Sequence, residues 1–86
     1  MILLYEIIFS LKAKKQFLKL GKTVQEKIIS ALERIRIRPE AFITKLVGDP
    51  GYKLRVGDYR IIIDIDKNKL LILVIKVGHR KNIYNI

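Results

Sequence analysis

The sequence predicts an α+β fold: an N-terminal strand, an antiparallel helix hairpin and a three-stranded antiparallel meander, with the helices on one face of the sheet. Residues 3–9 are rich in β-branched and aromatic side chains. Residues 11–38 carry apolar side chains at helical spacing, and residues 52–77 read as strands separated by turn signals. A chain of 86 residues has no room for a second core, so we expect a single domain over residues 1–86.

The helix hairpin is expected between residues 10 and 38. The Ser10 hydroxyl can cap the first helix, and Gly21 can end it. Thr23 and Glu26 form a capping-box pair for the second helix. That helix should stop at Arg38–Pro39, because the residue before a proline is pushed away from helical dihedral angles. The link between the two helices is short, which predicts an antiparallel pair.

The second half of the chain is expected to contain strands and tight turns. A brief strand at 45–47 precedes the turn-forming residues 48–51. The meander strands are expected at 52–56, 59–66 and 69–77, with turns at Gly57–Asp58 and Lys67–Asn68.

The turn at Gly57–Asp58 fixes which residues of the first two meander strands face each other. It places Arg55 directly opposite Arg60, with Lys53 on the same face, and it leaves only apolar pairs on the other face. Like charges across a strand pair are destabilising. The arrangement therefore indicates a polyanionic ligand.

The charge of the whole chain points in the same direction. The net charge is +10, from 18 basic and 8 acidic residues. Such a surplus attracts phosphate-rich partners, so nucleic acid is the leading candidate, followed by an acidic protein or an anionic membrane. An ordinary lysine-rich surface is the alternative. There is no cysteine, and the apolar N-terminus is interrupted by Glu6. We therefore expect a cytoplasmic protein with neither a signal peptide nor a membrane span.

The last meander strand carries an unbroken apolar run at residues 70–75, which suggests burial on both faces. Leu71, Leu73 and Ile75 are expected on the face that carries Arg60. A partner protein, a self-contact or the C-terminal residues 83–86 folding back could cover them.

No cofactor or metal site is expected. Asp64 and Asp66 share a strand face, but a cross-strand partner such as Lys69 and ordinary edge solubility explain them better than a metal ion. His79 is the only histidine, and its position beside Arg80 makes it a candidate for phosphate binding or catalysis.

The remaining candidates suit metal-free cleavage of RNA, in which the 2′-hydroxyl attacks the adjacent phosphate. Arg60 and Arg80 could converge on that phosphate, because arginine gives paired hydrogen bonds and stays charged. Lys53, crowded by arginines, would have a lowered pKa and could act as a base. Tyr84 could stack on a nucleotide base. Phosphate binding without chemistry is the alternative for each residue.

The segments KLVGDPGYKLRVGDYRIII and VIKVGHRKNIY, in this order of elements, resemble the RelE/ParE superfamily of bacterial and archaeal toxins. The resemblance covers almost the whole chain, and its strongest motif is the LRVGDYRI hairpin followed by GHR and a late tyrosine. Both branches share the hairpin. The RelE branch keeps the basic residues, cleaves mRNA in the ribosomal A site without metal, and is held inactive by an antitoxin that wraps it.

The resemblance implies a role for each candidate. Arg60 would stabilise the transition-state phosphate, Arg80 would protonate the leaving 5′-oxygen, and Tyr84 would orient the nucleotide. Lys53 would be the general base, assisted by Arg55.

The resemblance also implies contacts beyond the reaction. His79 and Lys81 would contact RNA, and the partners would be mRNA, ribosomal RNA and a cognate antitoxin, with no membrane. The apolar residues Leu71, Leu73 and Ile75 would face the antitoxin. The chain departs from the pattern at Gly51, where RelE-like enzymes can carry a further lysine. A ParE-like gyrase poison and a non-catalytic basic RNA-binding module remain alternatives.

Overall fold

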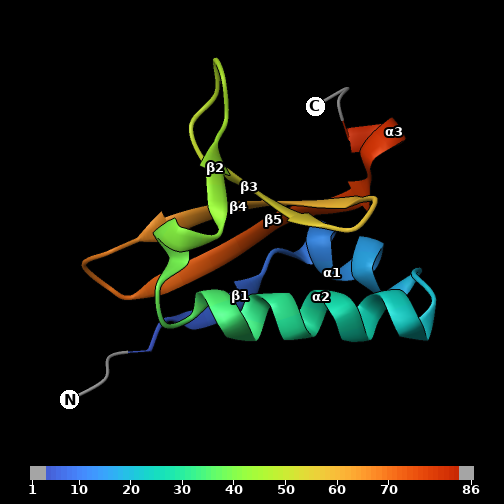
Figure 1. Cartoon of the computed structure of the whole chain (residues 1–86), viewed down its shortest axis with the longest axis horizontal. Coiled ribbons are helices and arrows are strands. Elements are labelled where there is room, and N and C mark those ends of the chain that lie inside the picture. Colours follow the sequence, from blue (N-terminus) through green and yellow to red (C-terminus); the bar gives the residue numbers. More distant parts are fainter. Residues whose placement is uncertain (1–3, 84–86) are drawn as a thin grey trace.

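The computed structural model describes residues 4–83 and confirms the α+β class, with helices packed on a sheet of strand order β1-β5-β4-β3-β2. Figure 1 shows α1 and α2 on one side of the sheet, while the β2–β3 connection and α3 rise from the other side. The elements are β1 (Glu6–Phe9), α1 (Leu11–Leu18), α2 (Lys22–Ile35), η1 (Pro39–Ala41), β2 (Ile43–Lys45), β3 (Tyr52–Val56), β4 (Tyr59–Asp66), β5 (Leu71–His79) and α3 (Arg80–Ile83).

The predicted register of the β3–β4 hairpin is confirmed. Arg55 pairs with Arg60 and Lys53 with Ile62, around the Gly57–Asp58 turn. The apolar pairs of this hairpin face α2, where Ile61 and Ile63 join the buried core. Burial of this apolar set fixes the register, because a slip by one residue would turn the basic side chains into the core.

The predicted turn between β4 and β5 is wrong. The turn spans residues 67–70 rather than Lys67–Asn68 alone, because the Asp66 carboxylate accepts the backbone N–H groups of Asn68 and Lys69, each at 3.0 Å. A bulge where β5 pairs with Ile62 and Ile63 adds one more residue to β5. Arg60 therefore lies opposite Gly78, and not beside Ile75 as the shorter turn predicts.

The helix boundaries confirm one predicted cap and correct another. The Ser10 hydroxyl accepts the Ala13 N–H at 3.1 Å, as expected. The capping box of Thr23 and Glu26 is not formed, because α2 begins at Lys22 with Gly21 as its N-cap residue and with no side-chain cap. The helix ends at Ile35, and Pro39 begins η1 instead. The short strand expected at 45–47 is observed as β2 at Ile43–Lys45, two residues earlier in the sequence.

Helix α1 covers the part of the β5 edge that β1 leaves unpaired. The strand β1 runs parallel to β5 but pairs with it only as far as Val74. Beyond that point the Gln16 side chain accepts the Val77 N–H at 2.8 Å, and the Ser10 hydroxyl donates to the Ile75 carbonyl at 3.1 Å. Polar side chains thus take the place of a neighbouring strand, and they hold α1 beside the end of β5 that leads to α3.

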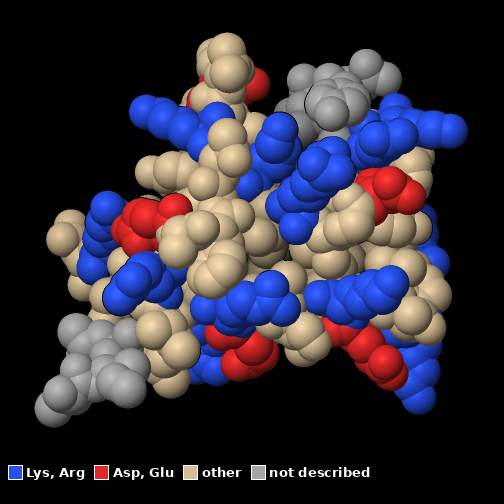
Figure 2. All heavy atoms as spheres, in the orientation of Figure 1, with Lys and Arg blue, Asp and Glu red and all other residues tan. Residues whose placement is uncertain are grey.

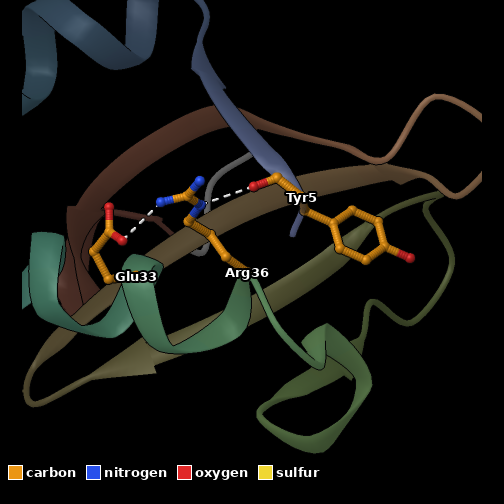
Figure 3. Close-up of polar contacts among 3 residues, drawn as sticks. All are labelled: Tyr5, Glu33 and Arg36. Carbon is orange, nitrogen blue, oxygen red and sulfur yellow. Dashed lines mark hydrogen bonds and ion pairs between the residues drawn. The ribbon is translucent and has the colours of Figure 1, made fainter. Parts of the chain in front are cut away.

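Arg36, at the end of α2, connects that helix to the start of β1 (Figure 3). Its Nε donates to the Tyr5 carbonyl at 2.8 Å, and its Nη1 pairs with Glu33 at 2.9 Å. The Tyr5 N–H in turn donates to the Arg36 carbonyl at 2.9 Å. Within residues 4–83 no helix is long and apolar enough to span a membrane.

We expect Arg36→Ala to lower the free energy of unfolding by about 1–2 kcal/mol, because it removes a charge-assisted hydrogen bond to a part-buried carbonyl. Urea denaturation followed by circular dichroism would measure the loss. The matched control is Glu33→Gln, which removes only the exposed ion pair and should cost about 0.5 kcal/mol or less. Equal losses in both variants would contradict this role of the Tyr5 contact.

Candidate nucleic-acid interface

The sheet face opposite α2, here called the open face, presents two adjacent cross-strand rows of residues. One row runs Arg55, Arg60, Gly78 across β3, β4 and β5, and the next runs Thr44, Lys53, Ile62, Lys76 across β2 to β5. Every charged side chain in these two rows is a cation. Figure 2 shows Lys and Arg atoms gathered in the corresponding region, above the sheet between the β2–β3 connection and α3.

Arg60 is the buried centre of this face, with only 6% of its surface exposed. Its Nη1 donates to the Gly57 carbonyl at 3.2 Å and to the Tyr59 carbonyl at 3.1 Å. These bonds hold the guanidinium against the turn and leave Nε and Nη2 without a partner among the described residues. Two guanidinium nitrogens are the groups with which arginine binds a phosphate oxygen pair, so Nε and Nη2 are the atoms of Arg60 that could do so.

Arg80 is attached to the same turn as Arg60. Its backbone N–H donates to the Asp58 carbonyl at 2.7 Å, which fixes the start of α3. The side chains of Arg80 and Lys81 are exposed. The Gly57–Asp58 turn therefore places both residues at one end of the sheet, and the convergence of their guanidiniums stays a prediction.

Arg55 lies at the border of the open face. Because β2 pairs only with Tyr52–Leu54, the edge of β3 is uncovered at Arg55. There Arg55 lines a groove of about 560 Å³ between β3 and α2, together with Lys27 and Arg34. In Figure 2 a second row of basic atoms follows α2. The basic surface thus continues from the open face around this edge.

His79 points away from Arg60. It pairs with Tyr59 across β4 and β5, and the two rings meet edge to face at 5.4 Å on the side where α1 packs. Both rings line a hollow of about 340 Å³ that also includes Gln16 of α1. Tyr84, the expected stacking residue, lies outside the described residues.

The apolar residues expected to meet a partner are split by the bulge. Leu71 and Leu73 lie on the open face at the end of the sheet far from the Gly57–Asp58 turn, where they line a hollow with Ile8. Ile75 is the extra residue of the bulge and is 37% exposed.

The carboxylates of Asp64 and Asp66 also line the hollow around Leu71 and Leu73, and both accept backbone N–H groups of their own strand or turn. They act as local turn and strand caps. Residues 4–83 contain no group of three or more His, Asp or Glu side chains placed to hold a metal ion.

Sequence reasoning missed Lys76. The short predicted turn put other residues of β5 beside Arg60, whereas the actual register puts Lys76 in the row next to it. Burial and the neighbouring Lys12 ammonium lower the pKa of Lys76. Counting along β5 from the β4–β5 turn finds Lys76 only when both the longer turn and the bulge are known.

The backbone explains why residue 51 is a glycine. Gly51 is buried and has φ +108°, a conformation that side chains rarely adopt. A Cβ at this position would lie 3.0 Å from the Ile63 carbonyl oxygen. The fold therefore disfavours the lysine that the resemblance allows here.

Comparison with known proteins identifies the family of the chain. Residues 7–84 match the profile of the family described as the ParE toxin of type II toxin–antitoxin systems, parDE. The mRNA interferase toxin RelE of Escherichia coli K12 is 34% identical over 80 residues, which cover 90% of this chain and 84% of RelE.

Solved structures show the same fold. The crystal structure of the intact E. coli RelBE toxin–antitoxin complex matches with a TM-score of 0.75 and 36% identity, over 87% of this chain and 95% of that one. The RelBE2 complex of Mycobacterium tuberculosis matches in fold with a TM-score of 0.84 at 19% identity, over 95% and 98%. The chain therefore belongs to the RelE/ParE superfamily of type II toxins, and to its RelE-like branch.

Proposed function

We propose that this protein is the toxin of a type II toxin–antitoxin pair and cleaves mRNA on the ribosome without a metal ion. The observation that carries the proposal is the anchored guanidinium of Arg60, which lies on a cationic face, keeps Nε and Nη2 unpaired among the described residues and shares its turn with Arg80. The identity to an mRNA interferase over most of the chain supports the same activity.

The proposed reaction is transesterification within the RNA. The ribose 2′-oxygen forms a bond to the adjacent phosphorus, and the bond from phosphorus to the 5′-oxygen breaks. Lys53 accepts the 2′-hydroxyl proton and Arg80 protonates the leaving oxygen. Arg60 stabilises the charge that develops on the phosphate, and Arg55 assists. Tyr84 stacks on a base to hold the nucleotide in line.

We further propose a cognate antitoxin as the partner that holds the toxin inactive, in the cytoplasm. Complexes with RelB antitoxins are the form in which several structurally similar toxins have been solved, including those of E. coli and Pyrococcus horikoshii. Leu71, Leu73 and Ile75 are exposed or partly exposed apolar residues that such a partner could cover.

The test is to express the chain without an antitoxin and to map mRNA 5′ ends during translation. We expect new ends at fixed codon positions, and we expect Arg80→Ala to reduce them by about a hundredfold because the leaving oxygen loses its proton donor. Lys14→Ala, an exposed position on α1, is the charge-matched control and should leave the pattern unchanged. Growth arrest without new mRNA ends would contradict the proposal.

A ParE-like gyrase poison is the second candidate, favoured by the description of the matching family. It predicts double-strand DNA breaks and an SOS response in place of mRNA cleavage. A basic RNA-binding module without chemistry would instead bind RNA and give no product at any concentration.

A further inference from the structure

A second cationic cluster lies where α1 packs against β5, next to the open face. Lys76 of β5 and Lys19 of α1 line the same hollow, and Lys12 of α1 lies close enough to Lys76 to repel its charge. None of the three forms an ion pair with an acidic residue within residues 4–83. The hollow itself has no acidic side chain in its lining.

This arrangement costs stability in the free protein. Like charges held close together repel, and an ammonium that is partly shielded from water loses part of its hydration. Both effects lower the pKa of Lys76, with burial as the larger cause. Lys12 and Lys19 are exposed, but the helix that carries them is held to β5 by the Gln16 and Ser10 hydrogen bonds. A bound anion would remove the repulsion.

Gly78 connects this cluster to Arg60. It is the cross-strand neighbour of Arg60 on the open face and also lines the hollow beside Lys76. Having no side chain, Gly78 places no side-chain atoms of its own between the two cationic groups. The aromatic rings of Tyr59 and His79 line the same hollow and offer surfaces on which a base can stack.

We propose that Lys12, Lys19 and Lys76 bind a backbone phosphate of the RNA next to the one held by Arg60, so that the strand continues across Gly78 toward α1. The identity of the ligand as RNA rests on the proposed function. These lysines position the strand and take no part in the proton transfers. His79 then contacts RNA at this second position rather than at the scissile phosphate.

Lys76→Met is the central test, because methionine keeps the apolar stem and removes the charge. Binding is measured by fluorescence anisotropy of a short single-stranded oligoribonucleotide, 2′-O-methylated so that it cannot be cleaved. We expect the dissociation constant to rise about tenfold for one lost charged hydrogen bond. The slope of log affinity against log salt should become shallower by about 0.7 for one lost phosphate contact.

The same variant should be more stable than the wild type, because the repulsion from Lys12 is gone. Lys12→Met should raise the melting temperature as well, and the double variant should gain less than the sum of the two, since both remove one shared interaction. Lys14→Met is the matched control on the same helix, where Lys14 lines a hollow on the other side of α1. It should change neither the melting temperature nor the salt slope to this extent.

The proposal is overturned if Lys76→Met weakens RNA binding no more than Lys14→Met does, or if it lowers the melting temperature. It is also overturned if the wild type does not bind the oligoribonucleotide. Equal loss of poly-glutamate binding and RNA binding in Lys76→Met would assign the site to acidic proteins instead. A further outcome separates the two proposals. If the wild type binds the oligoribonucleotide and Lys76→Met shows the expected losses, but the wild type cleaves no mRNA, this site is supported and only the proposed nuclease activity is contradicted.

Discussion

Arg60→Lys is expected to reduce mRNA cleavage by about a hundredfold to a thousandfold, the range found when one preorganised donor to a transition state is lost. Lysine keeps the charge but cannot hold the turn carbonyls with one nitrogen while presenting two others to the phosphate. The loss should appear in kcat more than in KM, because the developing charge exists only in the transition state. Single-turnover cleavage in a reconstituted translation system measures it.

Arg55→Lys is the control for this effect, since Arg55 lies directly opposite Arg60 but has no anchoring bond among the described residues. It should retain activity within about tenfold, as expected for a donor that only assists. Arg60→Lys should lower the melting temperature by a few degrees, because two hydrogen bonds to the turn carbonyls are lost while the charge opposite Arg55 is kept, so the cleavage rate is normalised to the folded fraction. Arg60→Lys with activity close to the wild type would remove Arg60 from the mechanism.

The open face could be predicted from the sequence because two local signals agree there. The turn residues Gly57–Asp58 set the strand pairing, and the alternation of apolar and basic residues fixes which face is buried. Together they give the Arg55–Arg60 pair that the structure confirms. The register of a short hairpin is set by its own turn and strands, so distant parts of the chain are not needed to predict it.

The β4–β5 register could not be predicted in this way. The turn there is lengthened by the Asp66 carboxylate, which caps two backbone N–H groups, and Leu70 adopts a φ of 54° that is uncommon for leucine. The bulge at Ile75 adds a further shift. Neither feature has a glycine or a proline to mark it. For this reason the sequence predicts Ile75 rather than Gly78 as the neighbour of Arg60, and it does not identify Lys76.

Gly51→Lys is expected to destabilise the protein by about 2–4 kcal/mol and to give no gain in activity per folded molecule. A non-glycine residue at φ +108° is strained, at about 1–3 kcal/mol. The added Cβ would also meet the Ile63 carbonyl oxygen at 3.0 Å, and that oxygen belongs to a central strand that cannot easily move. Urea denaturation measures the stability, and the cleavage assay is normalised to the folded fraction.

A comparison with Gly48 separates the two causes. Gly48 has φ +80°, but a Cβ added there would meet nothing within 4 Å, so Gly48→Ala should cost only the backbone strain of about 1–2 kcal/mol. Gly51→Ala should cost more, and the difference measures the contact with Ile63. If Gly51→Lys were as stable as the wild type and cleaved mRNA faster, the glycine would be a lost catalytic position. The expected result instead makes residue 51 a backbone requirement of this hairpin, so that Lys53 stays the proposed base.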